Sequence, residues 1–130
     1  MPTGNAGEYF LTGKLLRCGF DAQLADRNTQ GYDILVGRST HQALRKLQVK
    51  SARIAPWYVN QNQFKGDMLE MVTIYVLVGV TTDAKSVRHF IARNKDLASK
   101  VDSPENWTQS AFMSQNSLLP FEDKWESVLT

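Results

Sequence analysis

The 130-residue sequence has one cysteine, Cys18, only two histidines and no long hydrophobic run. A single cysteine excludes an intrachain disulfide and a cysteine-rich zinc site. His41 and His89 are too far apart to have a metal-ligand spacing. The longest apolar segment, residues 71–80, falls short of the ~18 residues that span a bilayer. No basic stretch followed by an apolar one opens the chain, so we expect no secretory signal, no membrane partner and a cytoplasmic location.

Familiar catalytic motifs are missing as well. The segment from Gly7 to Lys14 only superficially resembles a Walker loop, because its glycines are wrongly spaced and no Ser or Thr follows the lysine. There is no nucleophile elbow and no dinucleotide-binding fingerprint. Any chemistry must therefore come from other residue types.

The composition is that of an ordinary globular protein, with 42% hydrophobic and 22% charged residues. The length favours a single domain over residues 1–130. We expect its core within about residues 6–101 and a peripheral C-terminal segment over residues 102–130.

Basic residues gather in one part of the chain although the net charge is only +2. No acidic residue interrupts the five that lie between positions 38 and 53, namely Arg38, Arg45, Lys46, Lys50 and Arg53. Such a zone suits a polyanion such as a nucleic-acid backbone. A solvated charged hairpin is the alternative, and charge alone leaves both open.

Residue patterns predict several strands and an N-terminal helix. The helix is expected from about Ala6 to Cys18, with Asn5 as its N-cap and Gly19 at its end. Strands are expected at residues 20–25, 32–36, 43–51, around 57–59 and at 71–80. The last is the most apolar and should be central in the sheet. Gly37 to Gln42 holds the residues that close a hairpin.

The C-terminal half predicts further helices. Asp83 can cap a helix over residues 84–101, whose apolar face has helical spacing while Arg88 and His89 fall on the polar face. A helix start is indicated at residues 103–105, and a short helix anchored by Trp125 at residues 121–128. The order of elements predicts an α/β domain with a mixed sheet and helices packed against it.

Two of the expected strands carry a constellation of polar groups. Asp33 opens one strand, and Gln48 and Lys50 share one face of the next, because side chains alternate along a strand. An acid beside an amide oxygen and an ammonium forms a candidate site for a divalent metal and a phosphate. The alternatives are that Asp33 caps the turn after Gly31, or forms a structural ion pair with Lys50.

Glu8 is a further candidate. It lines up with Leu11 and Leu15 on one face of the first helix, so its carboxylate would face the sheet. The pattern from Asn5 to Glu8 also resembles a capping box, in which the acid bonds back to the N-cap amide. The sequence leaves both interpretations open.

Taken together, these segments resemble the PD-(D/E)XK nuclease superfamily, which includes restriction endonucleases and archaeal Holliday junction resolvases. The resemblance covers roughly residues 6–80 and rests on Gly7–Leu11, Leu15–Phe20, Gly31–Val36 and Leu47–Ser51. It implies a restriction-endonuclease-like fold, in which a mixed central sheet is flanked by helices.

The resemblance also implies roles for these residues. Asp33 would be the main metal-binding carboxylate, and Glu8 would approach the metal directly or through water. Gln48 stands where the superfamily usually has Asp or Glu, and its amide oxygen or the Val49 carbonyl could ligate. Lys50 would orient or help deprotonate the attacking water and offset charge on the phosphate. The implied ion is Mg²⁺ or Mn²⁺.

The expected function is therefore Mg²⁺-dependent endonuclease cleavage of phosphodiester bonds, in DNA in preference to RNA, by a possible homodimer. The contacts to the nucleic acid would come from Arg38, Arg45, Lys46 and Arg53. Gln48 removes a negative charge from the site and should weaken Mg²⁺ binding. A catalytically silent nucleic-acid-binding or interaction module on the same fold, and an unrelated α/β protein, are the alternatives.

Overall fold

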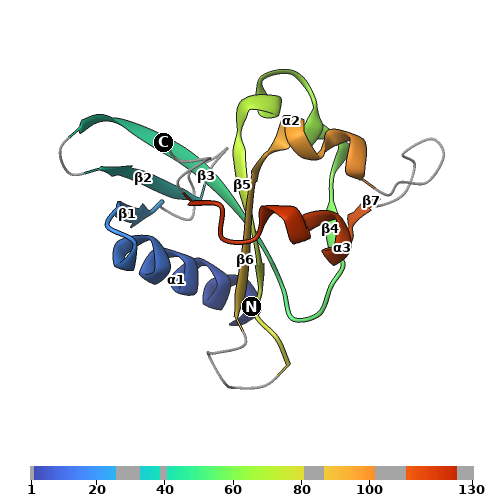
Figure 1. Ribbon diagram of the computed structural model, residues 1–130, viewed down its shortest axis with the longest axis horizontal. Coiled ribbons are helices and arrows are strands. Elements are labelled where there is room, and N and C mark those ends of the chain that lie inside the picture. The colour runs from blue at the N-terminus through green and yellow to red at the C-terminus, as the bar shows by residue number, and fades with distance from the viewer. Residues whose placement is uncertain (1, 26–32, 39–40, 81–86, 102–110, 126–130) are drawn as a thin grey trace.

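Five strands form a mixed sheet in the order β1-β2-β3-β5-β6, and two short strands, β4 and β7, form a separate antiparallel pair (Figure 1). The computed structural model describes residues 2–25, 33–38, 41–80, 87–101 and 111–125. The strands are β1 (Asp21–Leu24), β2 (Ile34–Arg38), β3 (His41–Ala52), β4 (Trp57–Val59), β5 (Val72–Leu77), β6 (Arg88–Arg93) and β7 (Ala111–Met113). The α-helices are α1 (Pro2–Arg17), α2 (Asn94–Leu97) and α3 (Gln115–Leu118). The 3-10 turns are η1 (Gln61–Phe64), η2 (Gly66–Glu70), η4 (Ala98–Lys100) and η5 (Leu119–Phe121).

The predicted strands of the N-terminal half are present. The β2–β3 hairpin is antiparallel, and β3 runs parallel to β5. β5 lies inside the sheet, as its apolar sequence predicted, although β3 takes the middle position. Five of its six residues are buried because the sheet is covered on both faces.

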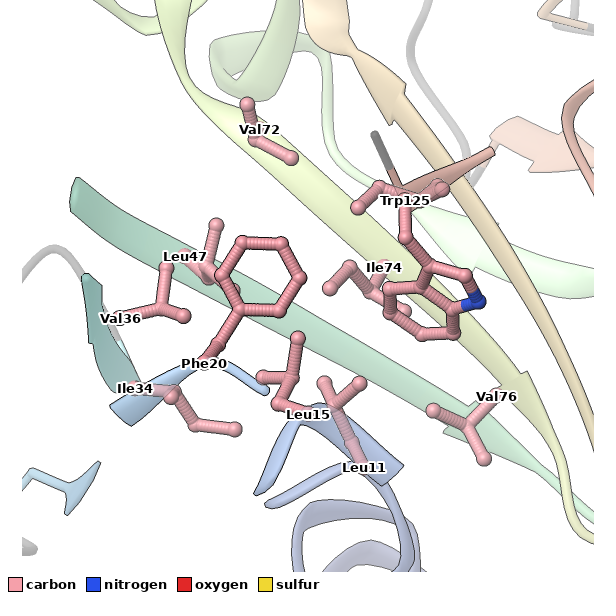
Figure 2. Close-up of a cluster of buried hydrophobic side chains, with 11 residues drawn as sticks. Leu11, Leu15, Phe20, Ile34, Val36, Leu47, Val72, Ile74, Val76 and Trp125 are labelled. Atoms are coloured by element: carbon pink, nitrogen blue, oxygen red, sulfur yellow. The ribbon is translucent and has the colours of Figure 1, made fainter. Parts of the chain in front are cut away.

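Helix α1 covers one face of the sheet. Its Leu11 and Leu15 are fully buried and pack with Leu47 and Ile74 of the sheet in the first core cluster (Figure 2). The helix ends as predicted, since Gly19 has a φ of +94°, a left-handed conformation that glycine adopts without strain.

The start of α1 differs from the prediction. The helix begins at Pro2, a residue favoured in the first helical position, so Asn5 lies inside it. The prediction of Asn5 as N-cap was therefore wrong, and so was the capping box that would have joined it to Glu8.

The opposite face of the sheet is covered by β4, β7 and the short helices α2 and α3 (Figure 1). Trp57 of β4 is at the centre of this second core cluster. Its ring lies edge-on to Tyr75 and to Phe90, with centroids 5.8 Å apart in each case. Two apolar cores therefore enclose the sheet.

The helix predicted over residues 84–101 was wrong. Residues 88–93 form strand β6, paired with β5, and only Asn94–Leu97 make a short α2. His89, Phe90, Ile91 and Ala92 are consecutively buried. That pattern suits a strand with both faces covered, but part of the run also matches helical spacing. Asp83, its predicted cap, lies outside the described residues.

The segment expected at the periphery contributes to both cores. Leu118 packs in the second cluster, and Trp125, which is 7% exposed, packs in the first (Figure 2). Between them, Glu122 pairs with Phe90 and accepts two hydrogen bonds of 2.8 Å from Arg88. Trp125 is the residue that the sequence predicted to anchor the segment at residues 121–128, and it is buried.

The helix predicted to begin at residue 121 was wrong at that point. Phe121 ends the 3-10 turn η5, and Asp123 has a φ of +56°, which a helix does not allow. Residues 126–128 and the helix start predicted at 103–105 lie outside the described residues. Within the described ranges, no helix is both long enough and apolar enough to cross a membrane.

Candidate metal and phosphate site

Asp33 is fixed where β2 begins. The β2–β3 ladder has Ile34 opposite Leu47 at this end, and Asp33 comes immediately before it. The main-chain N–H of Asp33 donates to the Leu47 carbonyl at 2.8 Å, and its carboxylate accepts the Val49 N–H at 2.8 Å. Among the residues that the structure describes, no ion pair joins Asp33 to Lys50. The carboxylate therefore lies against the β3 main chain.

Strand β3 carries the next three candidates. Asp33 itself lies just outside the regular ladder, since its N–H donates to Leu47, the partner of Ile34. Leu47 is fully buried and Val49 packs against the α1 core, so alternation places Gln48 and Lys50 on the other face. These two side chains are half-buried.

The Val49 carbonyl has a defined direction. In an extended residue the N–H and C=O point to the same edge of the strand, because a hydrogen-bonded pair exchanges both bonds with one partner. Since the Val49 N–H is bonded to Asp33, the Val49 carbonyl also points to the Asp33 side of β3. A carboxylate and a main-chain oxygen are thus aimed into the same region.

Glu8 lies on α1, which passes close to this part of β3 at Gly7. The neighbouring Gly7 is buried so closely against Ser51 that a Cβ atom at Gly7 would collide with the Ser51 side chain. Glu8 is itself half-buried. Because α1 covers the face on which Val49 lies, Glu8 approaches from the opposite face to Gln48 and Lys50.

The predicted nucleic-acid-binding residues are distributed along the same hairpin. Lys46 is exposed. It lies two residues before Gln48, so it is on the same face of β3 as Gln48 and Lys50. Arg45 is half-buried in β3, whereas Arg53 is exposed just beyond the strand. Arg38 ends β2, and its side chain is outside the described part of the structure.

Sequence reasoning missed a polar row on β5. Thr73 is the register partner of Gln48, and Tyr75 is the partner of Lys50, so all four lie on one face of the sheet. The signal was present, because Thr73 and Tyr75 alternate with three apolar residues in this strand. Burial raises the pKa of the Tyr75 hydroxyl above its usual value, and the hydrogen bond from Gln63 opposes this shift.

A buried network holds this row in place. The Gln63 side-chain amide donates to the Tyr75 hydroxyl at 2.8 Å, and the Thr73 hydroxyl donates to Asn94 Oδ1 at 2.7 Å. The Asn94 amide donates in turn to the carbonyls of Gln63, at 2.9 Å, and Met68, at 2.8 Å. These bonds tie Thr73 and Tyr75, the β5 partners of Gln48 and Lys50, to Gln63 and Asn94 in the buried interior.

The donor set fits a hard divalent cation. Within the described residues, no group of three or more His, Cys, Asp or Glu side chains is placed to hold a metal. The oxygen atoms that could serve as ligands are those of the Asp33 carboxylate, the Val49 carbonyl and the Gln48 amide. A carboxylate has about four lone-pair sites, of which the Val49 N–H needs one. Mg²⁺ prefers oxygen ligands and retains several waters, so a sparse set suffices.

Neither a protein-family model nor a curated protein sequence matches the chain. Solved structures do match. The Holliday junction resolvase Hjc of the archaeal hyperthermophile Archaeoglobus fulgidus is similar with a TM-score of 0.55 and 15% sequence identity, over 91% of this chain and 93% of that one. A bacterial homing endonuclease is similar with a TM-score of 0.55 and 12% identity, over 97% of this chain and 89% of that one.

The chain has the restriction-endonuclease-like fold, a mixed sheet flanked by helices. This confirms the fold predicted from the PD-(D/E)XK resemblance. At these identities the similarity concerns the fold, and the chemistry has to be argued from this chain's own residues.

Proposed function

We propose that this protein is a divalent-metal-dependent endonuclease that hydrolyses phosphodiester bonds in DNA. One observation supports it most strongly: the Asp33 carboxylate accepts the main-chain N–H of Val49, which lies between Gln48 and Lys50 on β3. The neighbours with this fold are a Holliday junction resolvase and a homing endonuclease.

In this proposal, Asp33, the Val49 carbonyl and the Gln48 amide hold Mg²⁺ or Mn²⁺, and Glu8 contributes directly or through water. The ion, when bound, supplies Lewis-acid activation of the phosphate and of the attacking water. Asp33 is suited to the central role because its carboxylate is already oriented by the β3 main chain.

Lys50 lies two residues beyond Gln48 on the same face of β3. Its ammonium would orient the attacking water and offset the negative charge that develops on the phosphate. Lys46, on that face, and Arg45, Arg53 and Arg38 would contact the neighbouring phosphates. A two-fold dimer would place two such sites on the two strands of a duplex. Cytoplasmic residence is part of the same proposal.

Gln48 supports a second candidate function, because a neutral amide gives the ion less negative charge than the usual carboxylate. A protein with too weak a metal site would bind nucleic acid without cleaving it. This silent module would have the same fold and the same basic residues, so activity must be measured.

The test is cleavage of branched, duplex and single-stranded DNA, and of RNA, with Mg²⁺, Mn²⁺ or a chelator. The variants are Asp33→Asn and Lys50→Ala. Asparagine keeps an oxygen that accepts the Val49 N–H but loses the charge, so the fold should be retained. We expect both variants to lower the cleavage rate by about a hundredfold or more. Lys65→Ala, which changes an exposed lysine in the loop before η2, is the matched control.

Metal-dependent cleavage that both variants retain would assign the activity to a contaminant and remove the proposal. Binding of DNA with no cleavage of any substrate would favour the silent module.

A further inference from the structure

A hollow lies where β3 and β5 end. It has a cavity volume of about 340 Å³ and is open to solvent, within the range of pockets that bind small molecules, about 300–1,000 Å³. Its walls are apolar and come from Ile54, Ala55, Leu77 and Val80. Ile54 and Val80 are 67% and 58% exposed. The hollow therefore leaves an apolar surface accessible to a ligand.

The two strands hold this hollow in a fixed position relative to Lys50. Lys50 is the register partner of Tyr75, and the next pair on the same face, Ala52 and Leu77, leads into the hollow. This step is two residues along the strand, or about 7 Å. Main-chain bonds continue the pairing beyond it, with Gly79 N–H donating to the Arg53 carbonyl at 3.1 Å.

Two polar side chains complete the lining. Arg53 supplies a cation, and Gln115, at the start of α3, supplies an amide that can both donate and accept. Together these features match a nucleotide. The apolar walls accept a flat base, the amide can bond its polar edge, and the cation can bind a phosphate. A purely apolar ligand would not use Arg53.

We propose that this hollow binds the nucleoside next to the cleaved phosphate of a DNA substrate. The base lies against Ile54 and Leu77, Gln115 contacts its polar edge, and Arg53 binds the phosphate on its far side. The step along the strands from the Lys50–Tyr75 pair to the Ala52–Leu77 pair is comparable to one nucleotide of an extended strand. This inference rests on the proposed function, and it adds a selection for DNA whose strand can splay one base out of the stack.

The test is a metal-free NMR titration with thymidine 5′-monophosphate, chosen because its base methyl suits apolar walls. We expect the largest amide shifts at residues 53–55 and 77–80 and at Gln115. Deoxyribose 5-phosphate, which lacks the base, should bind more weakly. Ile54→Asp should weaken nucleotide binding by about tenfold, since it removes an apolar contact of the base. Arg53→Gln should weaken it several-fold.

Matched controls separate the hollow from general surface effects. Leu16→Asp changes an exposed leucine on α1, and Arg17→Gln changes an exposed arginine there. Both should leave binding unchanged. Shifts that are absent from the hollow, equal affinity for deoxyribose phosphate, or equal losses in the control variants would each overturn the inference.

The titration does not depend on cleavage, so the two proposals can fail separately. Nucleotide binding at the hollow in a protein that cleaves nothing would support the pocket and remove the nuclease. If Ile54→Asp left cleavage unaffected and no shifts appeared at the hollow, the nuclease would be supported and the nucleoside pocket would be removed.

Discussion

At the scale of single residues, Gln48 is the position on which the chemistry depends. It lies next to Val49, whose N–H donates to the Asp33 carboxylate, and its partner on the neighbouring strand β5 is Thr73. An amide at this place can donate an oxygen to a cation, but it brings no charge. The affinity of the site for a divalent cation should therefore depend on the charge of the side chain at position 48.

Gln48→Glu should strengthen Mg²⁺ binding by about tenfold, because charge count tunes the affinity of oxygen sites. Without metal, the second carboxylate should repel Asp33 and lower the free energy of unfolding. Calorimetric Mg²⁺ titration and denaturation with and without Mg²⁺ measure the two effects. Gln23→Glu, which changes an exposed glutamine of β1, is the control. Equal responses of the two variants would show that position 48 does not bind the ion.

Residue patterns indicated these candidates because their spacing along strands is local information. Alternation alone placed Gln48 and Lys50 on one face. The contact between Asp33 and the Val49 N–H could not be predicted in the same way, since it depends on where the β2–β3 register starts. The hollow was missed for a related reason, because Arg53, Leu77 and Gln115 are far apart in sequence.

At the scale of elements, the close approach of α1 to β3 sets the position of Glu8. Gly7 permits this approach, because a Cβ atom there would collide with the Ser51 side chain. The sequence predicted α1, apart from its start, and β1 to β5, because Gly19 marks the helix end, turn residues separate the strands and β5 is a single apolar run. It failed at β6, where a strand buried on both faces shows no alternation and also satisfies a helical pattern.

Gly7→Ala should lower the free energy of unfolding by about 1–3 kcal/mol, because the added methyl overlaps the Ser51 side chain. Gly13→Ala should instead raise it by about 0.5–1 kcal/mol, since alanine favours a helix interior and nothing lies within 4 Å of the added Cβ. Denaturant unfolding measures both. Ser51→Gly should rescue Gly7→Ala in the double variant, and the absence of rescue would contradict the contact.

At the scale of the whole molecule, the C-terminal segment joins the two cores across the β6 edge. Its Leu118 belongs to one core and its Trp125 to the other, and Asp123 N–H donates to the His89 carbonyl at 3.1 Å. His89 is buried beside Trp125, with ring centroids 5.6 Å apart. Burial lowers the pKa of His89 to about 4, with Lys14 acting in the same direction and Asp123 and Glu122 opposing it.

The free energy of unfolding should consequently fall as the pH is lowered, and this fall should begin at a pH well above the pKa of most carboxylates. The unfolded chain binds a proton at His89 near pH 6.5, whereas the folded chain does so only near pH 4. The full stability is therefore present above pH 6.5, and on the order of 3 kcal/mol is lost as the pH falls to about 4.

Denaturant unfolding between pH 7 and pH 5 measures this slope. His89→Gln should flatten it, while His41→Gln, which removes the other histidine of the chain, should leave it unchanged. If His41→Gln flattened the slope and His89→Gln did not, the pH dependence of stability would come from His41, which would contradict the prediction.

The central claim is that a divalent ion binds beside Asp33 at the edge of β3. Paramagnetic Mn²⁺ broadens the amide NMR signals of the residues nearest to it, so a titration of the folded protein locates the site directly. We predict that the amides of Asp33 and of residues 48–50 broaden first, and that Asp33→Asn abolishes this broadening while its spectrum stays folded. Broadening centred elsewhere, or unchanged in Asp33→Asn, would contradict the account.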